Sequence, residues 1–98
     1  MKKYLVDYKT EIINSDEIIK PDGFTSIMFR NLGDDDATIL ENVPLTNPAV
    51  DEINQEFVFI NRPGEIINTD IPIRFAGVGS TKKILMTKVY YTEGNFAI

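Results

Sequence analysis

Two segments of the sequence carry apolar side chains at successive positions, and this feature constrains the fold more than any other. They are Glu56 to Ile60 and Ile84 to Tyr91. Side chains that follow one another in a β-strand point to opposite faces of the sheet, so both faces of these two strands are apolar. A single core covers only one face. We therefore expect a small β protein whose second face meets an extra layer or another subunit, and we favour another subunit.

The rest of the sequence predicts an all-β fold, an antiparallel β-sandwich of about eight strands. Turn signals rich in Gly, Pro, Asn and Asp separate stretches rich in Ile, Val, Phe, Tyr and Thr, which suit strands. We predict a single domain over residues 1–98, because a chain of this length holds one thin core. The predicted strands are 3–9, 11–14, 17–20, 24–30, 37–43, 56–61, 65–68, 71–76 and 82–92.

Three local features give sharper predictions. Pro63 and Gly64 suit the two central positions of a type II turn, so a hairpin is expected there. Residues 71–75 alternate between apolar and other positions, and Pro72 places this strand at an edge or with Pro72 facing outward. A short helix within 48–55 is an alternative to a loop.

The chain contains no histidine and no cysteine. Histidine is the commonest general base near neutral pH, and both residues are the usual ligands of zinc and copper. We therefore expect a non-enzymatic protein that uses no cofactor. Acidic pairs such as Asp51 and Glu52 lack an apolar setting that would raise a pKa, so we interpret them as solvated loop residues.

Calcium is the one metal that the composition leaves open. Asp34-Asp35-Asp36 offers several carboxylate oxygens, which a hard cation prefers, and Asp34 and Asp36 are the candidate ligands. The run is not an EF-hand, because Ile39 and Leu45 stand where that motif has its glycine and its bidentate glutamate. We favour the other interpretation, an acidic turn without metal.

A glycine-rich segment, Gly77-Val78-Gly79-Ser80, resembles the start of a phosphate-binding loop. The dinucleotide fingerprint needs a third glycine where Lys82 stands, and no helix pattern follows. We interpret the segment as a flexible connection between strands.

The net charge of −5 is unevenly distributed. Residues 34–73 carry nine acidic residues and one basic residue, whereas residues 74–98 carry four basic residues and one acidic residue. Nucleic-acid binding needs clustered Lys and Arg, so we expect no nucleic-acid partner. The unlike segments are suited to orienting neighbouring copies head to tail; the alternative is ordinary solvated surface charge.

We also expect no membrane partner and no signal peptide. A membrane helix needs about 20 apolar residues in succession, and the chain has no run of that kind. The apolar stretch near the start, Tyr4 to Val6, is too short for the hydrophobic region of a signal peptide.

Five short segments between Phe24 and Phe75 occur in an order that resembles a known class of proteins. The segments are Ile27–Gly33, Ala37–Leu40, Val43–Leu45, Pro63–Ile66 and Ile71–Phe75. The class is the small β-sandwich proteins in virions of tailed bacteriophages, namely decoration, auxiliary capsid, connector and tail proteins. The chain departs from the class after Leu45, where an acidic segment, 47–56, replaces a short polar link. The resemblance implies a virion protein, made in the host cytoplasm, that assembles and has no catalytic site.

The sequence therefore predicts a structural or assembly component whose partners are other subunits, most simply copies of itself in a homo-oligomer or array. A carbohydrate-binding or adhesion-type β-sandwich is the alternative. Which face of the two-faced strands is core and which is contact stays open at this point. The predicted interface residues are Phe57, Phe59, Met86, Val89 and Tyr91, or their neighbours on the opposite face.

Overall fold

The computed structural model describes residues 3–49 and 54–94. In these residues the chain forms eight strands and no helix, so the predicted all-β class is confirmed. No helix in the described ranges is long and apolar enough to cross a membrane. The strands are β1 (Lys3–Ile13), β2 (Glu17–Ile19), β3 (Ser26–Asn31), β4 (Ala37–Ile39), β5 (Val43–Leu45), β6 (Glu56–Phe59), β7 (Ile71–Phe75) and β8 (Ile84–Gly94).

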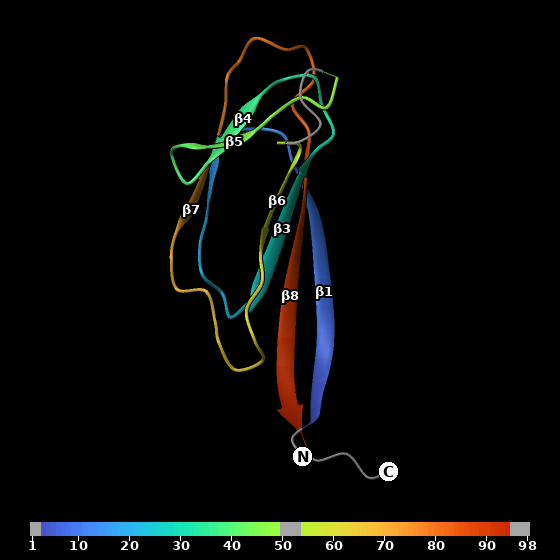
Figure 1. Ribbon diagram of the computed structural model, residues 1–98, viewed down its shortest axis with the longest axis vertical. Helices are drawn as coiled ribbons and strands as arrows, with labels where there is room; N and C mark the ends of the chain where they lie inside the picture. The colour runs from blue at the N-terminus through green and yellow to red at the C-terminus, as the bar shows by residue number, and fades with distance from the viewer. Residues whose placement is uncertain (1–2, 50–53, 95–98) are drawn as a thin grey trace.

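The strands form two four-stranded sheets in the orders β1-β8-β3-β6 and β2-β7-β4-β5, and every pairing is antiparallel. The two sheets lie face to face in a β-sandwich (Figure 1). Alternate residues of each strand point into one core, and burying a large apolar side chain stabilises by about 1.5 to 3 kcal/mol. Core residues that are at most 1% exposed include Ile27, Phe29, Ile84 and Met86 from the first sheet and Ile39, Leu45, Ile71 and Ile73 from the second.

Several strand boundaries differ from the predicted ones. Residues 3–13 form one strand where the sequence suggested two, because β8 pairs with every residue of β1. The predicted strand 37–43 is divided into β4 and β5. Leu40 and Glu41 have φ angles of 54° and 71°, and this left-handed backbone reverses the chain between the two strands.

The turn at Pro63 and Gly64 forms, but the predicted hairpin is wrong. Gly64 has a φ of 92°, and the Glu65 N–H donates to the Arg62 carbonyl at 3.0 Å. Beyond the turn the chain does not pair with β6; it crosses to the other sheet, where β7 lies. Buried Ile67 holds this crossing segment against the core, and its N–H donates to the Phe24 carbonyl.

β7 does not lie at an edge: it pairs with β2 on one side and β4 on the other. Pro72 lies between buried Ile71 and Ile73 and so points away from the core, as the second of the two predictions for this strand expects. The segment 48–55, for which a short helix was the alternative to a loop, falls partly on residues 50–53, which lie outside the described residues. The Asp51–Glu52 pair lies outside them too.

A buried carboxylate links two loops at one end of the sandwich. Asp35 is 0% exposed and accepts hydrogen bonds from the N–H groups of Gly77, Val78 and Gly79 at 2.9 to 3.1 Å. The glycine-rich segment thus cradles an anion, as phosphate loops do, but the anion belongs to the chain itself. Burial alone raises the pKa of Asp35; the three N–H donors and the charge of Lys82 outweigh it, and the pKa is lowered.

Close backbone contact completes this junction. A Cβ atom on Gly33 would collide with the backbone of Thr81, so only glycine fits there. Buried Asn31 donates to the carbonyls of Asp35 and Leu45 and accepts from the Gly33 N–H, which ties three neighbouring segments together. Among the described residues, no buried side-chain nitrogen or oxygen lacks a hydrogen-bond partner.

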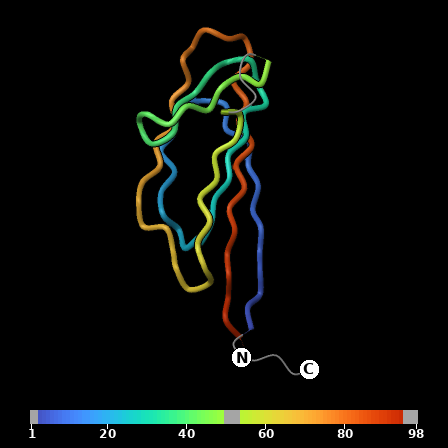
Figure 2. Tube along the Cα trace, in the orientation of Figure 1, coloured from blue at the N-terminus to red at the C-terminus, as the bar shows by residue number. Residues whose placement is uncertain are grey.

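The first sheet extends well beyond the sandwich. Pairing of β8 with β3 ends at Val89, and residues 90–94 continue with residues 3–7 of β1 alone as their partner. We call this two-stranded extension the arm; it projects past the loops of the body in both views (Figures 1 and 2). The chain consequently measures 52 Å along its longest axis, and its radius of gyration of 15.3 Å exceeds the roughly 13 Å of a compact chain of this length.

We expect Asp35→Asn to lower the free energy of unfolding by about 3 kcal/mol, because an amide nitrogen would face N–H groups that now donate to a carboxylate. The lowered pKa means that the Asp35 contribution is present above pH 3.8 and is lost as the pH falls below it through the folded-state pKa. Urea denaturation at pH 7 and pH 3 measures both effects.

Asp70→Asn is the matched control. Asp70 forms an exposed ion pair with Lys20 at 2.7 Å, and such pairs contribute no more than about 1 kcal/mol. Equal losses of stability in the two variants would contradict the role that we assign to Asp35.

Candidate functional site

The face of the β1-β8-β3-β6 sheet that points away from the core is the candidate site, and we call it the outer face. Because Ile27 and Phe29 of β3 point inward, Met28 and its cross-strand neighbours point outward. The strand registers arrange these outward residues in rows across the sheet. From the body to the arm the rows are Glu56–Arg30–Leu85–Ile12, Val58–Met28–Thr87–Thr10, Ile60–Ser26–Val89–Tyr8, Tyr91–Val6 and Glu93–Tyr4.

The outer face is mostly apolar and much of it is open to solvent. Val58 is 43% exposed, Ile60 78%, Tyr8 66% and Ile12 50%. An antiparallel sheet that faces water usually carries polar residues on that side, so this face departs from the normal pattern. Contiguous exposed apolar surface is a feature of interaction sites, and this makes the outer face the candidate.

Charged residues on the outer face stand at its two ends. Arg30 and Glu56 form an exposed ion pair at 3.4 Å in the first row, and Glu93 lies in the last. In the three described rows between them, no side chain is charged. The middle of the face can therefore be covered by another surface without the cost of removing a charge from water.

Shallow hollows lie along the same face. One of about 170 Å³ is lined by Met28, Val58, Leu85 and Thr87 among others, and one of about 180 Å³ lies nearer the arm between Tyr8 and Tyr91. Both are smaller than the roughly 300 to 1,000 Å³ of typical small-molecule pockets. Their shape suits the side chains of a protein surface more than an enclosed ligand.

The five residues predicted as an interface divide between the two faces. Met86 is 1% exposed in the core, and Phe57 and Phe59 are half-buried against it with their rings 5.0 Å apart. Val89 and Tyr91 point to the outer face, where Val89 is buried at 6% exposed and Tyr91 is half-buried. The structure thus decides which face of each strand is core, and on β6 it exposes Val58 and Ile60 where Phe57 and Phe59 were named.

β1 contributes outer-face residues that the sequence analysis did not single out. The outward positions Tyr4, Val6, Tyr8 and Ile12 are apolar, interrupted by Thr10, and this period of two is visible in the sequence. The charged residues Lys3, Asp7, Lys9 and Glu11, which alternate with these positions on the other face of the strand, obscure the apolar pattern in the sequence.

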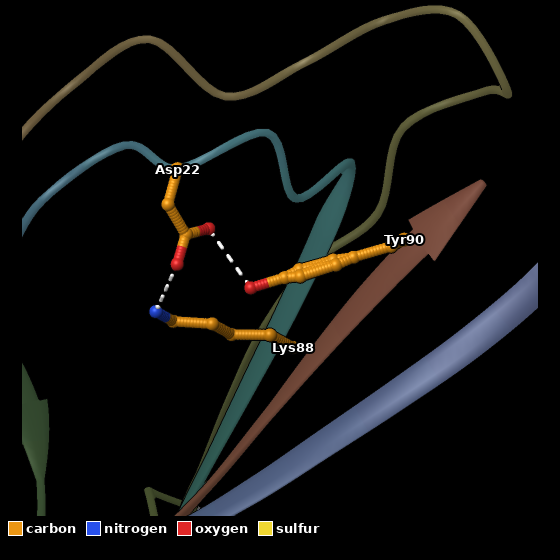
Figure 3. A network of polar contacts seen from close by, with 3 residues as sticks. All are labelled: Asp22, Lys88 and Tyr90. Carbon is orange, nitrogen blue, oxygen red and sulfur yellow. Dashed lines mark hydrogen bonds and ion pairs between the residues drawn. The ribbon is translucent and has the colours of Figure 1, made fainter. Parts of the chain in front are cut away.

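A polar network holds the arm at its root (Figure 3). Asp22, in the loop between β2 and β3, accepts from the Lys88 ammonium and from the Tyr90 hydroxyl, both at 2.9 Å. Both partners lie on the inner side of β8, where the strand leaves the body. Lys9 and Lys88 stand directly opposite each other; Asp22 neutralises Lys88, and the Lys9 ammonium lies 5.1 Å from the centre of the Tyr90 ring.

The network shifts two pKa values in opposite directions. Burial and the hydrogen bond to Asp22 together raise the pKa of Tyr90 to about 12; the hydrogen bond contributes because only the neutral hydroxyl donates. Burial also acts to raise the pKa of Asp22, but hydrogen bonds from Lys88 and Tyr90 and the nearby positive charges lower it overall. The carboxylate therefore remains charged and fixes the direction in which the arm leaves the sandwich.

The carboxylates of the acidic run are used inside the chain. Asp34 accepts from the Ser80 hydroxyl and the Thr81 N–H, each at 2.6 Å, and Asp36 accepts from the Asn47 N–H at 2.8 Å. Within residues 3–49 and 54–94, no group of three or more acidic side chains is placed to hold a metal ion. The favoured interpretation, an acidic turn without metal, stays a prediction, and calcium binding by Asp34 and Asp36 stays its untested alternative.

The same contacts bring oppositely charged parts of the sequence together. Asp34 and Asp35 contact the segment 77–81, which lies between Arg74 and Lys82. The acidic run and the start of the basic segment therefore meet at one end of the sandwich. This placement gives no support to the idea that they face neighbouring copies from opposite ends.

Comparisons with known proteins add no relative: no protein-family model, curated protein or solved structure matches the chain.

We expect Tyr90→Phe to remove one tyrosine ionisation near pH 12, measured as tyrosinate absorbance during alkaline titration. Because the pKa of Tyr90 is raised on folding, its contribution to stability is complete below pH 10.0 and is lost as the pH rises through about 12. The free energy of unfolding of the variant should therefore fall less than that of the wild type as the pH rises through about 12. Tyr8→Phe is the control and should leave the step near pH 12 in place.

Proposed function

We propose that this chain is a non-enzymatic structural subunit of a protein assembly, and that it acts by docking its outer face against neighbouring subunits that include copies of itself. One observation carries the proposal: a sheet with a complete core on one side presents a second apolar surface on the other. Val58, Ile60 and Tyr8 are the most exposed large apolar residues in its uncharged rows.

The geometry suits a protein partner. The face is broad, the hollows in it are shallow, and its charges stand at the ends, where they would form the polar rim of an interface. A small sandwich also buries a limited part of its own surface, so association would add to its stability.

The direction of the pKa shifts among the described carboxyl groups supports a non-catalytic role. Each carboxyl group whose pKa is shifted, namely Asp22, Asp34 and Asp35, is shifted downward by hydrogen bonds within the chain. A general acid at neutral pH needs the opposite shift. These carboxylates build loops and anchor the arm.

The virion of a tailed bacteriophage is the setting that we propose for this assembly. It is supported by the resemblance between residues 24 and 75 and virion β-sandwich proteins. The genes that flank the coding sequence test the setting directly. Capsid, portal or tail genes beside it would support the proposal, and a gene cluster for bacterial surface polysaccharides or adhesins would oppose it.

The variant Val58→Lys with Ile60→Lys tests the outer face. Wild-type protein should form oligomers whose mass grows between about 10 µM and 1 mM, measured by size-exclusion chromatography with light scattering. Burial of each side chain contributes about 1.5 to 3 kcal/mol, so two lysines should weaken this contact at least about 100-fold. Its far-ultraviolet circular dichroism should not change, because both positions already face water.

Ile66→Lys with Val78→Lys is the matched control. These residues are 62% and 84% exposed and lie in loops outside the outer face, so the same change of charge should leave the oligomers intact. A wild-type chain that stays monomeric throughout the concentration range would contradict the proposal, and so would equal behaviour of the two variants.

A carbohydrate-binding module is the second candidate, because Tyr8 and Tyr91 border the hollow nearest the arm. Aromatic rings beside a shallow groove can stack on sugars. Titration calorimetry of the monomeric chain with oligosaccharides separates the two functions. Saturable binding that Tyr91→Ala abolishes would favour the second candidate.

A further inference from the structure

The four edges of the two sheets differ greatly in length. β6 pairs through four residues, and β2 and β5 through three each, with Pro44 in β5. β1 has eleven residues, contains neither proline nor glycine, and in the described part of the chain pairs with β8 on one side only. Proteins normally protect long edges with charged side chains, proline, bulges or short strands, because unpaired N–H and C=O groups bind a further strand. Of these devices β1 has only the charged side chains, at Lys3, Asp7, Lys9 and Glu11.

β1 also carries apolar side chains that are open to solvent. Leu5 is 53% exposed, Val6 40%, Tyr8 66% and Ile12 50%. Half of the strand belongs to the arm, where it has β8 as its sole neighbour, and a two-stranded ribbon is marginally stable in water. A third strand beside the arm would supply hydrogen-bond partners for the unpaired edge of β1.

We propose that β1 pairs antiparallel with β1 of a second copy, about a two-fold axis that passes through Tyr8 and joins the two sheets into one of eight strands. The inference rests on the proposed function, since it names one contact of the assembly. The two outer faces then lie on the same side and form one continuous apolar surface.

The charges of β1 select this register. When all eleven residues of β1 pair with all eleven residues of β1 in the second copy, Tyr8 lies opposite Tyr8. In the same register Asp7 lies opposite Lys9. Symmetry makes this pair twice, and opposite charges at facing positions stabilise a sheet. The strand thus complements itself when its full length is used.

Neighbouring registers are opposed by the same side chains. A shift in one direction places Asp7 opposite Asp7 of the second copy, and a shift in the other places Lys9 opposite Lys9. Shifts of an odd number of residues would set outward side chains against inward ones. Among registers that pair nine residues or more, the one centred on Tyr8 therefore avoids like charges at facing positions.

Disulfide formation tests the register, because the natural chain has no cysteine. Tyr8→Cys places two thiols at facing positions on the axis, where Cα atoms about 4.5 to 5.5 Å apart allow a disulfide. Val6→Cys is the control; its thiol would face Thr10, and the two substituted positions would be about 13 Å apart along the strands. We expect oxidation to give covalent dimers of the first variant and at least about 10-fold fewer of the second.

Charge exchange tests the same contact without cysteine. Asp7→Lys and Lys9→Asp should each weaken dimerisation by about 10- to 100-fold, and the double variant should recover it to within about 3-fold. The two single variants, the double variant and the unsubstituted β1 are all compared in the Val58→Lys, Ile60→Lys background, so that dimers through β1 are measured alone. Urea denaturation of each variant shows whether the monomer is still folded.

The outcomes separate this inference from the proposed function. Equal cross-linking of Tyr8→Cys and Val6→Cys, or no recovery in the folded double variant, would overturn pairing through β1 while leaving the outer face as a docking surface. The opposite result is that Tyr8→Cys forms the disulfide while Val58→Lys with Ile60→Lys leaves the oligomers unchanged. That result would overturn outer-face docking and retain the β1 contact.

Discussion

The position of β8 between β1 and β3 is the constraint on which the rest of this structure depends. Its inward residues Ile84 and Met86 complete the core, and its outward residues Leu85, Val89 and Tyr91 build the centre of the outer face. Its last five residues extend past β3 and form the arm with β1. Core, outer face and arm are therefore three consequences of one long strand with apolar residues on both faces.

Polar contacts in the loops determine how rigidly this strand is held. Asp35 fixes the segment that leads into β8 by accepting three backbone N–H groups, and Asp22 fixes β8 again where it leaves the body, through Lys88 and Tyr90. Both carboxylates have lowered pKa values, so they remain charged at neutral pH. An arm with a fixed direction loses less conformational entropy when a partner binds it.

The exposed apolar outer face and the long unpaired edge of β1 support the same proposal about function. Among the described residues, the carboxylates of Asp22, Asp34 and Asp35 accept hydrogen bonds that tie loops and strands together within the chain. The surfaces that we propose for contact are the uncharged middle rows of the outer face and the strand β1. Such surfaces suit repeated contacts between subunits.

The sequence by itself determined the strand content, the turns at Pro63-Gly64 and before β4, and the presence of surplus apolar surface, because period-two alternation and turn chemistry are local properties. It did not determine that Phe57 and Phe59 face inward while Val58 and Ile60 face outward. That choice depends on the register of β6 with β3, which places Phe57 beside Phe29 across the core side. The use of Asp35 as the anion for residues 77–79 and of Asp22 as the anchor of the arm joins residues more than forty positions apart. Only the tertiary structure decides such contacts, because no local pattern records which distant segments meet.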